Sequence, residues 1–448
     1  LNDPTWLQSL KEAQVSALSV AKDLITLRTA RERSTGVILK PAGDSYDRFA
    51  ETFAYDETAD QKKAIADIMS DLTSGKPMDR LICGDVGFGK TEVAMRAAFM
   101  MADQGYQVAV LAPTTLLAQQ HYSTFCSRFE ETPHKVMLAN KNTFSALERK
   151  QLSKGDVQIV IGTHRLLQGD INFRNLGLII VDEEHLFGVR QKEQLRTVRG
   201  NKHLLSMAAT PIPRTLGMAI SGIRDMSIIA TPPARRLSVR TLLREQNDRV
   251  IQEAVQREMS RSGQVFYLHN RIGSMPDCVK HLQSLIPNAR IAMVHGDMRE
   301  DEMFDIMLAF RNREYDILVG TTVIEIGIDV PNANTLIVEK ADALGLGQLH
   351  QLRGRVGRST RQAYAYLLSN VSTGVANMRL KAMEAATNLG EGFVIARHDM
   401  EIRGIGEILG EEQSGHVHRI GFALYMRLLE QAIKALDDER ASPGYDLE

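Results

Sequence analysis

Eight consecutive residues indicate the architecture of this chain: Gly84-Asp85-Val86-Gly87-Phe88-Gly89-Lys90-Thr91. They follow a β-rich run at 80–83 and precede a segment that reads as a helix beginning near Thr91. In this strand–loop–helix context, the spacing Gly-x4-Gly-Lys-Thr is typical of a loop whose backbone amides surround phosphate oxygens. Lys90 can reach the β- and γ-phosphates, and Thr91 can ligate Mg²⁺. The sequence therefore predicts a nucleoside-triphosphate site rather than a plain glycine-rich turn.

The loop lies in a region, residues 50–231, where short apolar runs alternate with helical stretches. The runs lie at 80–83, 108–111, 159–161, 178–181 and 203–207. Continuous apolar strands separated by helices indicate a parallel sheet buried on both faces, which predicts an α/β doubly wound lobe. Two prolines in 231–236 indicate a linker. A second lobe of the same class is expected at 232–374, with runs at 264–268, 291–294, 317–319, 335–338 and 363–367.

Two further segments flank the lobes. Residues 1–49 predict a helix from about 3 to 33 and a connection, since Asp3 can cap the helix and Pro4 suits its first turn. Residues 375–448 predict a helical segment to about 389, a stretch rich in Gly and charge, and a final apolar helix at 422–436. Residue 1 is Leu rather than Met, which predicts that the chain is an excised or processed piece.

The amino-acid composition indicates the cellular compartment of the protein but says little about its function. The 448 residues include 54 basic and 55 acidic side chains, a net charge of −1. A nucleic-acid partner stays open, because a basic stripe on one face suffices for binding. Three cysteines without a Cys-x-x-Cys pair argue against a disulfide framework or zinc site. Without a membrane-length apolar run or secretory signal, we expect a cytoplasmic protein with no membrane partner.

Acidic residues follow the apolar run at 178–181 and read Asp182-Glu183-Glu184-His185. A carboxylate pair at the end of a buried strand suits a Mg²⁺ site beside a phosphate loop. Asp182 would hold the metal, and Glu183 would orient and deprotonate an attacking water. A solvated acidic turn is the alternative interpretation.

Three arginines stand within six residues of the second expected lobe, in the stretch 351–358. A γ-phosphate under attack needs positive charge, and arginine supplies it as a finger. Arg355 and Arg358 are the candidates for this role. A surface patch is the alternative.

These segments resemble, in order and spacing, the motifs of superfamily 2 helicases. The resemblance implies an adenine-reading motif with Phe53 and Gln61, and nucleotide contacts from Gly327 and, near the ribose, from Asp329. It implies that Thr210, within 209–215, couples hydrolysis to lobe movement. It implies DNA contacts in both lobes from Thr114, Thr115, Thr163, His164, Arg165, Thr321 and Thr322.

Residues 209–215 and 348–358 have a form shared by RecG-type branch-migration enzymes and bacterial transcription-repair coupling factors. Both groups also carry a translocation motif after the second lobe, which we read in 393–415 with Arg403 and Gln413 as coupling residues. Stretches at 84–98, 113–122, 221–236 and 410–415 resemble the coupling factors in particular. The likeness covers nearly all of residues 1–436.

The resemblance implies two RecA-like lobes and a DNA-dependent ATPase that uses ATP and Mg²⁺. It also implies movement along double-stranded DNA without strand separation, which pushes a stalled RNA polymerase forward during DNA repair. RNA polymerase and excision-repair proteins would bind through modules absent from this chain. Leu186, Ile326 and Ile405 depart from the usual residues of the motifs. A RecG-like fork-remodelling helicase and a catalytically weak DNA-binding scaffold are the alternatives.

Overall fold

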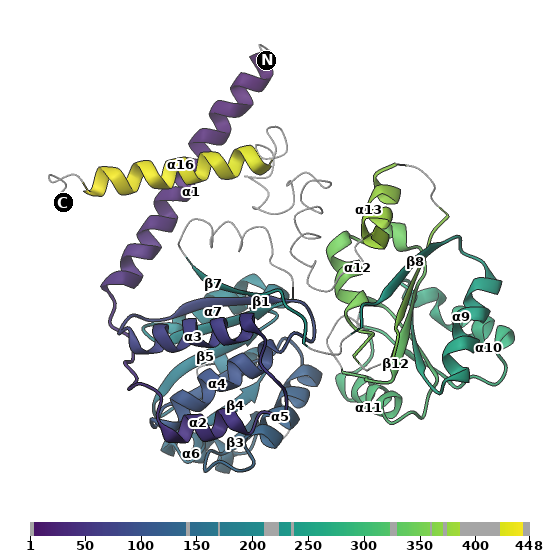
Figure 1. Ribbon diagram of the computed structural model, residues 1–448, viewed down its shortest axis with the longest axis horizontal. Coiled ribbons are helices and arrows are strands. Elements are labelled where there is room, and N and C mark those ends of the chain that lie inside the picture. The colour runs from purple at the N-terminus through teal and green to yellow at the C-terminus, as the bar shows by residue number, and fades with distance from the viewer. Residues whose placement is uncertain are drawn as a thin grey trace.

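A computed structural model describes residues 4–139, 144–168, 171–209, 224–233, 237–322, 329–358, 361–370, 374–385 and 422–441. Within these ranges the chain forms two α/β lobes, each with a parallel sheet between helices, and two long helices that lie apart from the sheets (Figure 1). The predicted fold class is thereby confirmed. The hook expected around Arg403 lies outside the described residues.

The first lobe contains a seven-stranded sheet in which every pair of neighbouring strands is parallel. In sheet order the strands are β3 (Val136–Ala139), β4 (Ile159–Gly162), β2 (Gln107–Leu111), β5 (Leu176–Asp182), β6 (His203–Ala208), β1 (Asp79–Gly84) and β7 (Asp225–Ile229). The five expected runs are all present, and β3 and β7 are additional. Strands β2, β4 and β6 are buried along their whole length, and β1 is buried at all but its first residue. The loops at their carboxyl ends are therefore held by a rigid core.

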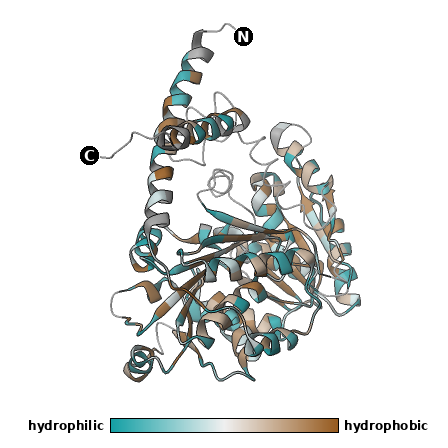
Figure 2. Cartoon of the chain, turned by 60° about the vertical axis from the view of Figure 1, so that its left-hand side comes forward, coloured by the Kyte–Doolittle hydropathy of each residue, from teal (hydrophilic) through white to brown (hydrophobic). Residues whose placement is uncertain are grey.

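Helices cover both faces of this sheet. They are α2 (Asp44–Glu51), α3 (Ala59–Thr73), α4 (Lys90–Asp103), α5 (Thr115–Phe129), α6 (Ala146–Lys154) and α7 (Val189–Arg199), with 3-10 turns η1 (His164–Leu167) and η2 (Glu184–Leu186). Helix α4 is buried from Glu92 to Ala102, because it lies between other elements rather than at the surface. Figure 2 shows hydrophobic residues running along the strands, whereas the helices mix both kinds of residue.

The second lobe has a six-stranded parallel sheet. Its order is β10 (Ile291–Val294), β11 (Ile317–Gly320), β9 (Gln264–Leu268), β12 (Ala333–Val338), β13 (Tyr364–Leu368) and β8 (Arg240–Arg244), and β8 was not expected. The remaining elements are α9 (Asp248–Ser260), η3 (Ile272–Ser274), α10 (Met275–Leu285), α11 (Glu300–Arg311), η5 (Ala341–Ala343), α12 (Leu346–Arg353) and α13 (Gly374–Ala385).

Two long helices, α1 (Pro4–Arg33) and α16 (Phe422–Ala441), cross and pack against each other (Figure 1). Ala13, Ala17 and Ala21 are fully buried at helical spacing on α1, and Leu429 and Ile433 are buried on α16. Helix α16 extends five residues beyond the expected end at 436. Among the described helices, none is long and apolar enough to cross a bilayer.

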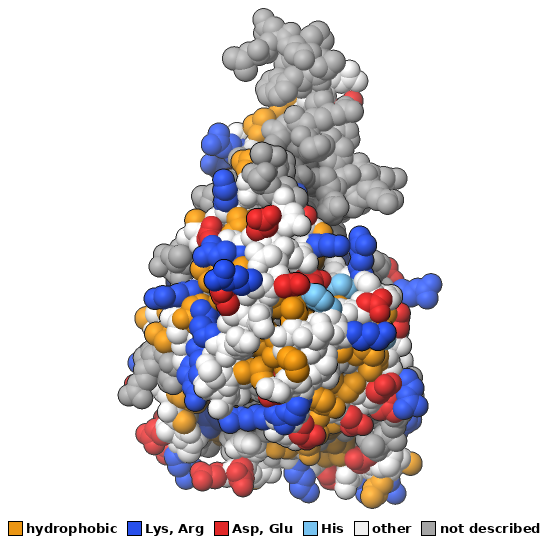
Figure 3. Space-filling view, turned by 90° about the vertical axis from the view of Figure 1, so that its right-hand side faces the viewer, with side chains coloured by type: hydrophobic (Ala, Val, Ile, Leu, Met, Phe, Trp, Pro, Cys, Tyr) orange, Lys and Arg blue, Asp and Glu red, His pale blue; other side chains and the backbone are white. Residues whose placement is uncertain are grey.

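The face of the second lobe that carries α9 and α10 shows basic and acidic side chains interspersed (Figure 3). Mixed charge of this kind does not produce the extended positive field that attracts a phosphate backbone.

Candidate functional site

The phosphate-type loop begins where β1 ends, and its backbone is shaped by glycine. Gly87 and Gly89 have φ angles of +80° and +78°, a left-handed conformation that glycine adopts at no steric cost. A Cβ at Gly89 would also stand 2.3 Å from Nε2 of Gln61. Phe88 is fully buried and anchors the loop in the core. The loop is thus fixed in position directly before the N-terminus of α4.

Lys90 folds back over this loop. Its Nζ donates hydrogen bonds to the carbonyl oxygens of Gly84, at 2.5 Å, and Asp85, at 3.1 Å. Burial lowers the pKa of Lys90, whereas the negative charges of Glu183, Asp182 and Asp85 act in the opposite direction. The ammonium group is therefore enclosed among carboxylates and carbonyls at the first-lobe side of the site.

Asp182 is the last residue of β5, and its carboxylate is fixed at both oxygens. Oδ1 accepts a hydrogen bond from the backbone N–H of Glu183 at 3.0 Å, and Oδ2 lies 2.7 Å from Nε2 of His121. Burial would raise the pKa of Asp182, but the bond and charge of His121 and the charge of Lys90 lower it on balance. An ionised carboxylate held in this way suits a hard cation such as Mg²⁺.

Glu183 has a left-handed backbone, with φ 46° and ψ 51°, which is uncommon for a residue with a side chain. Its Oε2 accepts a weak hydrogen bond from the backbone N–H of Ala209 at 3.4 Å. The neighbouring Glu184 has another role, since its carboxylate pairs with the buried Arg224 at 2.8 Å. The acidic stretch therefore has two roles. Asp182 and Glu183 line a cavity between the lobes, whereas Glu184 forms an ion pair inside the first lobe.

The arginines come from the second lobe and reach the same boundary. Arg355 is buried, and Nη1 of Arg358 donates to Oδ1 of Asp329 at 3.0 Å. The lobes approach closely here, because a Cβ at Gly354 would stand only 3.1 Å from side-chain atoms of Val86.

A cavity of about 640 Å³ lies between the lobes and brings most of these groups together. This volume falls within the range of small-molecule sites. Its lining includes, from the first lobe, Val86, Gly87, Gly89, Lys90, Thr91, Asp182 and Glu183, and, from the second, Thr322, Asp329, Gln351, Arg355 and Arg358. Residues expected at the site on separate grounds thus share one pocket.

The expected adenine-reading residues lie close to the loop. Gln61 accepts a hydrogen bond from the backbone of Thr58 at 2.9 Å and donates to the carbonyl of Phe88 at 2.8 Å, so its amide supports the loop. Phe53 packs edge-on against Tyr55, and Tyr55 rather than Phe53 lines the cavity. Contact of Phe53 and Gln61 with a base stays a prediction.

The residues expected to contact DNA follow the carboxyl ends of parallel strands. Thr114 caps α5 after β2, and its hydroxyl accepts from the N–H of Leu117 at 3.3 Å. Thr163, His164 and Arg165 follow β4, and Thr321 and Thr322 follow β11. Carboxyl ends of neighbouring parallel strands share one edge of a sheet. The role of these residues in DNA binding stays a prediction.

Several expected site residues cannot be placed. Thr210, Gly327, Arg403 and Gln413 lie outside the described residues, as do Ile326 and Ile405. Leu186, the remaining departure from the motifs, is about half exposed and lines the cavity.

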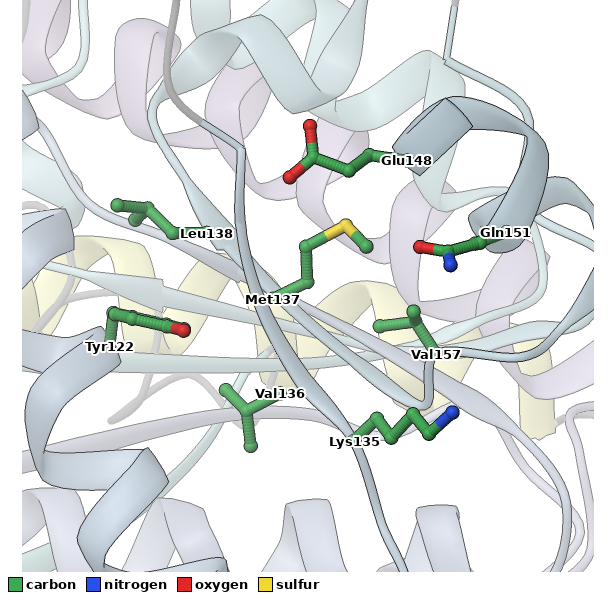
Figure 4. Close-up of a pocket in the computed structure, with 8 residues that line it drawn as sticks. All are labelled: Tyr122, Lys135, Val136, Met137, Leu138, Glu148, Gln151 and Val157. Atoms are coloured by element: carbon green, nitrogen blue, oxygen red, sulfur yellow. The ribbon is translucent and has the colours of Figure 1, made fainter. Parts of the chain in front are cut away.

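A second hollow, of about 580 Å³, lies at the outer edge of the first sheet (Figure 4). Tyr122 of α5, Glu148 and Gln151 of α6 and residues of β3 line it. None of the site residues expected from the sequence lines this hollow. It therefore lies apart from the site between the lobes.

Three potential metal ligands, His269, Cys278 and Glu339, lie within 4.8 Å of one another in the second lobe. The two oxygens of Glu339 already accept hydrogen bonds, from the hydroxyl of Tyr267 and from Nδ1 of His269, both at 2.5 Å. Burial and the charge of Glu339 raise the pKa of Cys278 to about 12, so its thiol is protonated. Glu339 and His269 thus belong to a hydrogen-bonded network with Tyr267, and the protonated thiol of Cys278 lies beside it.

Five residues that line the cavity were not expected at the site from the sequence: Tyr55, Leu117, Gln120, His121 and Thr124. Gln120 and His121 lie on α5, six and seven residues after Thr114. A helix interior carries no loop signature. Several other polar residues lie on α5, so Gln120 and His121 did not stand out in the sequence.

Comparisons with known proteins show which families the chain matches. Residues 58–219 match the DEAD/DEAH box helicase family, and residues 245–360 match the helicase conserved C-terminal domain. The transcription-repair-coupling factor of Haemophilus influenzae is 52% identical over 447 residues, which cover 98% of this chain and 39% of that protein. That of Escherichia coli is 50% identical over 454 residues, covering 100% of this chain and 40% of that protein. The chain thus spans about two-fifths of the length of these relatives.

Solved structures show the same architecture. RecG bound to a three-way DNA junction is 36% identical with a TM-score of 0.76, and the match covers 94% of this chain and 56% of RecG. Saccharomyces cerevisiae Dbp5 bound to RNA and ADP BeF3 is 18% identical with a TM-score of 0.58, covering 77% of this chain and 91% of Dbp5. The likeness to Dbp5 is one of fold alone.

Proposed function

Because the chain belongs to the transcription-repair-coupling factor family, we propose that it is an ATP-driven motor that moves along double-stranded DNA. In the whole protein this motor would push a stalled RNA polymerase forward during DNA repair in the cytoplasm. Contacts with RNA polymerase and excision-repair proteins would come from parts of the relatives that this chain does not span.

One observation carries the proposal: the cavity between the lobes needs both of them to be complete. Lys90, Asp182 and Glu183 line it from the first lobe, and Arg355 and Arg358 line it from the second. A site divided in this way can exist fully only when the lobes are closed. Binding and loss of the γ-phosphate would therefore change the preference between closed and open states, which is how a nucleotide drives movement.

Each group in the cavity has a chemical role in this proposal. Lys90 would leave the carbonyls of Gly84 and Asp85 to bind phosphate oxygens, and the loop amides would bind others. Thr91 and Asp182 would hold Mg²⁺, which neutralises phosphate charge when bound. Glu183 would orient the attacking water.

Arg355 and Arg358 would supply positive charge on the opposite side of the γ-phosphate. Arg358 would exchange its present carboxylate partner, Asp329, for phosphate oxygens. Asp329 would then be released to bind a ribose hydroxyl.

The DNA contacts would lie along the carboxyl ends of the strands of both lobes. Hydroxyls of Thr114, Thr163 and Thr321, with nearby amides, would bind phosphates of one strand without reading bases. Thr210 would couple hydrolysis to lobe movement, and Arg403 and Gln413 would convert that movement into a step along the duplex. Such binding would be largely independent of sequence and would weaken with salt.

The test is a pair of assays on the chain with ATP and Mg²⁺. Duplex DNA should stimulate ATP hydrolysis, and the protein should displace the third strand of a triplex without separating the duplex. Lys90→Ala should abolish hydrolysis while the melting temperature stays within about 2 °C of the parent. Absence of DNA stimulation would favour a DNA-binding scaffold and would refute the motor proposal.

The likeness to RecG supports a second candidate, remodelling of DNA forks. The discriminating measurement is unwinding of a forked DNA beside a plain duplex of the same sequence. Efficient unwinding of the fork would favour the RecG-like activity over translocation without strand separation.

A further inference from the structure

Helix α5 of the first lobe contacts the second lobe through one side. Oγ1 of Thr115 donates to Oε2 of Glu300 at 2.9 Å, and Leu116 packs against the hydrophobic core of the second lobe. One turn later, Oε1 of Gln120 accepts a hydrogen bond from the backbone N–H of Asp329 at 3.0 Å. These contacts join α5 to the second lobe as well as to its own sheet.

The residue after Gln120 contacts the opposite side of the site. His121 is 96% buried, and its Nε2 lies 2.7 Å from Oδ2 of Asp182. The ring packs edge-on against Phe125, which is itself fully enclosed in the core. Consecutive helical residues point about 100° apart. One side chain can therefore reach the second lobe while the next reaches β5.

These positions form a series of polar contacts that is completed by the covalent link between Gln120 and His121. Arg358 donates to Asp329 at 3.0 Å, the backbone of Asp329 donates to Gln120 at 3.0 Å, and His121 bonds Asp182 at 2.7 Å. The series begins at an arginine of the second lobe and ends at the carboxylate of the first. Gln120 and His121, the third and fourth of its five members, are consecutive residues of one helix.

We propose that Gln120 and His121 are positioning residues that couple closure of the two lobes to the placement of the Asp182 carboxylate. The inference rests on the proposed function, since it takes Asp182 as the Mg²⁺ ligand and Arg358 as the arginine of the second lobe. When the lobes close, Gln120 binds the segment that carries Asp329, and α5 holds His121 against Asp182. When the lobes open, the Gln120 contact is lost and α5 is held from one side only.

Coupling of this kind is reciprocal. If closure favours the metal-binding position of Asp182, then Mg²⁺ with nucleotide must favour closure by the same factor. The effect should therefore appear in equilibrium binding, without turnover. Coupling energies along such networks correspond to roughly threefold to thirtyfold changes in affinity.

The experiment measures binding of a fluorescent, non-hydrolysable ATP analogue, first with Mg²⁺ and then with a chelator. The quantity of interest is the gain in affinity that Mg²⁺ produces. His121→Ala should reduce this gain about tenfold, and Gln120→Ala about threefold to tenfold, whereas binding with chelator should stay within about twofold. Ser123→Ala, an exposed position on the same helix, is the matched control and should change neither value.

A double variant tests whether the two residues act together. Residues in one series should be non-additive, so Gln120→Ala with His121→Ala should lose little more than His121→Ala alone. His121→Asn retains an N–H donor and should recover part of the gain. If His121→Ala does not fold, Gln120→Ala and His121→Asn carry the test.

Several outcomes would overturn the inference. These are a Mg²⁺-dependent gain that survives in Gln120→Ala, additive losses in the double variant, or equal losses with and without Mg²⁺. A parent protein whose nucleotide binding does not respond to Mg²⁺ would overturn it too. In contrast, a parent with Mg²⁺-dependent binding but no DNA-stimulated hydrolysis would refute the motor proposal alone.

Discussion

Glu92, in the first turn of α4, should contribute strongly to the stability of the first lobe. Its side chain is buried and accepts from Arg96 at 2.6 Å and from Arg128 at 3.0 and 3.1 Å. Glu92→Gln keeps the shape of the side chain but removes the charge between two guanidinium groups. Removing one partner of a buried ion pair costs about 3–5 kcal/mol.

The lower end of this range applies, because both arginines keep other acceptors. Arg96 is still paired with Glu57 at 2.6 Å, and Arg128 still donates to the carbonyl of Phe49 at 2.6 Å. We therefore expect a loss of about 3 kcal/mol. For a lobe of this size, such a loss lowers the melting temperature by about 6–12 °C.

The assay is differential scanning calorimetry, which measures the melting temperature of each variant beside the parent. Glu253→Gln is the matched control, because Arg249 and Glu253 have the same i,i+4 spacing and a distance of 2.8 Å, but both side chains are well exposed. That variant should leave the melting profile nearly unchanged. If Glu92→Gln changes the melting temperature as little as the control variant does, the reasoning that burial strengthens this ion pair is refuted.

Three further predictions concern the boundary, the proton balance and the translocation motif. A side chain at Gly354 would meet Cβ and Cγ2 of Val86 across the boundary, so Gly354→Val should slow ATP turnover about tenfold. Adding Val86→Gly, which removes both atoms, should restore much of the turnover. Burial lowers the pKa of His203 below its ordinary value near 6.5, so His203 of the unfolded chain binds a proton before that of the folded chain as pH falls. The melting temperature should therefore drop from pH 7.5 to 5.5. His203→Gln should make that drop smaller. Arg403→Ala, outside the described residues, should preserve DNA-stimulated hydrolysis but impair triplex displacement, and unimpaired displacement would exclude Arg403 from the stepping mechanism.

The strands that the sequence did not predict share a position in the fold. β3 and β7 are the two edges of the first sheet, and β8 is an edge of the second. An interior strand of a parallel sheet is buried on both faces and reads as a continuous apolar run. At an edge the burial is lower: in β8 only Thr241 is buried, and the strand begins and ends with exposed arginines. Periodicity therefore found every interior strand of the two described sheets. Of their four edge strands it found only β10, whose run at 291–294 was expected.

Some residues of the candidate site could be recognised from the local sequence, whereas others are placed there only by tertiary contacts. Residues 84–91 and Asp182 could be recognised because each follows an apolar strand, and the carboxyl ends of parallel strands lie at one edge. Gln120 and His121 follow no strand. Their partners are set by tertiary packing: Gln120 contacts a residue 209 positions away, and His121 contacts one 61 positions away. No local pattern specifies contacts of that kind.

This division has a consequence for how the protein would work. Groups that strand ends place are fixed within each lobe, so they are present whether the lobes are open or closed. Groups that depend on contact between lobes, such as Gly354 against Val86 and Asp329 against Gln120, exist only in the closed arrangement. Nucleotide binding can therefore use the fixed groups alone, whereas hydrolysis would wait for closure. A motor needs nucleotide binding, lobe closure and hydrolysis in this order, because hydrolysis in the open state would not be coupled to movement of the lobes.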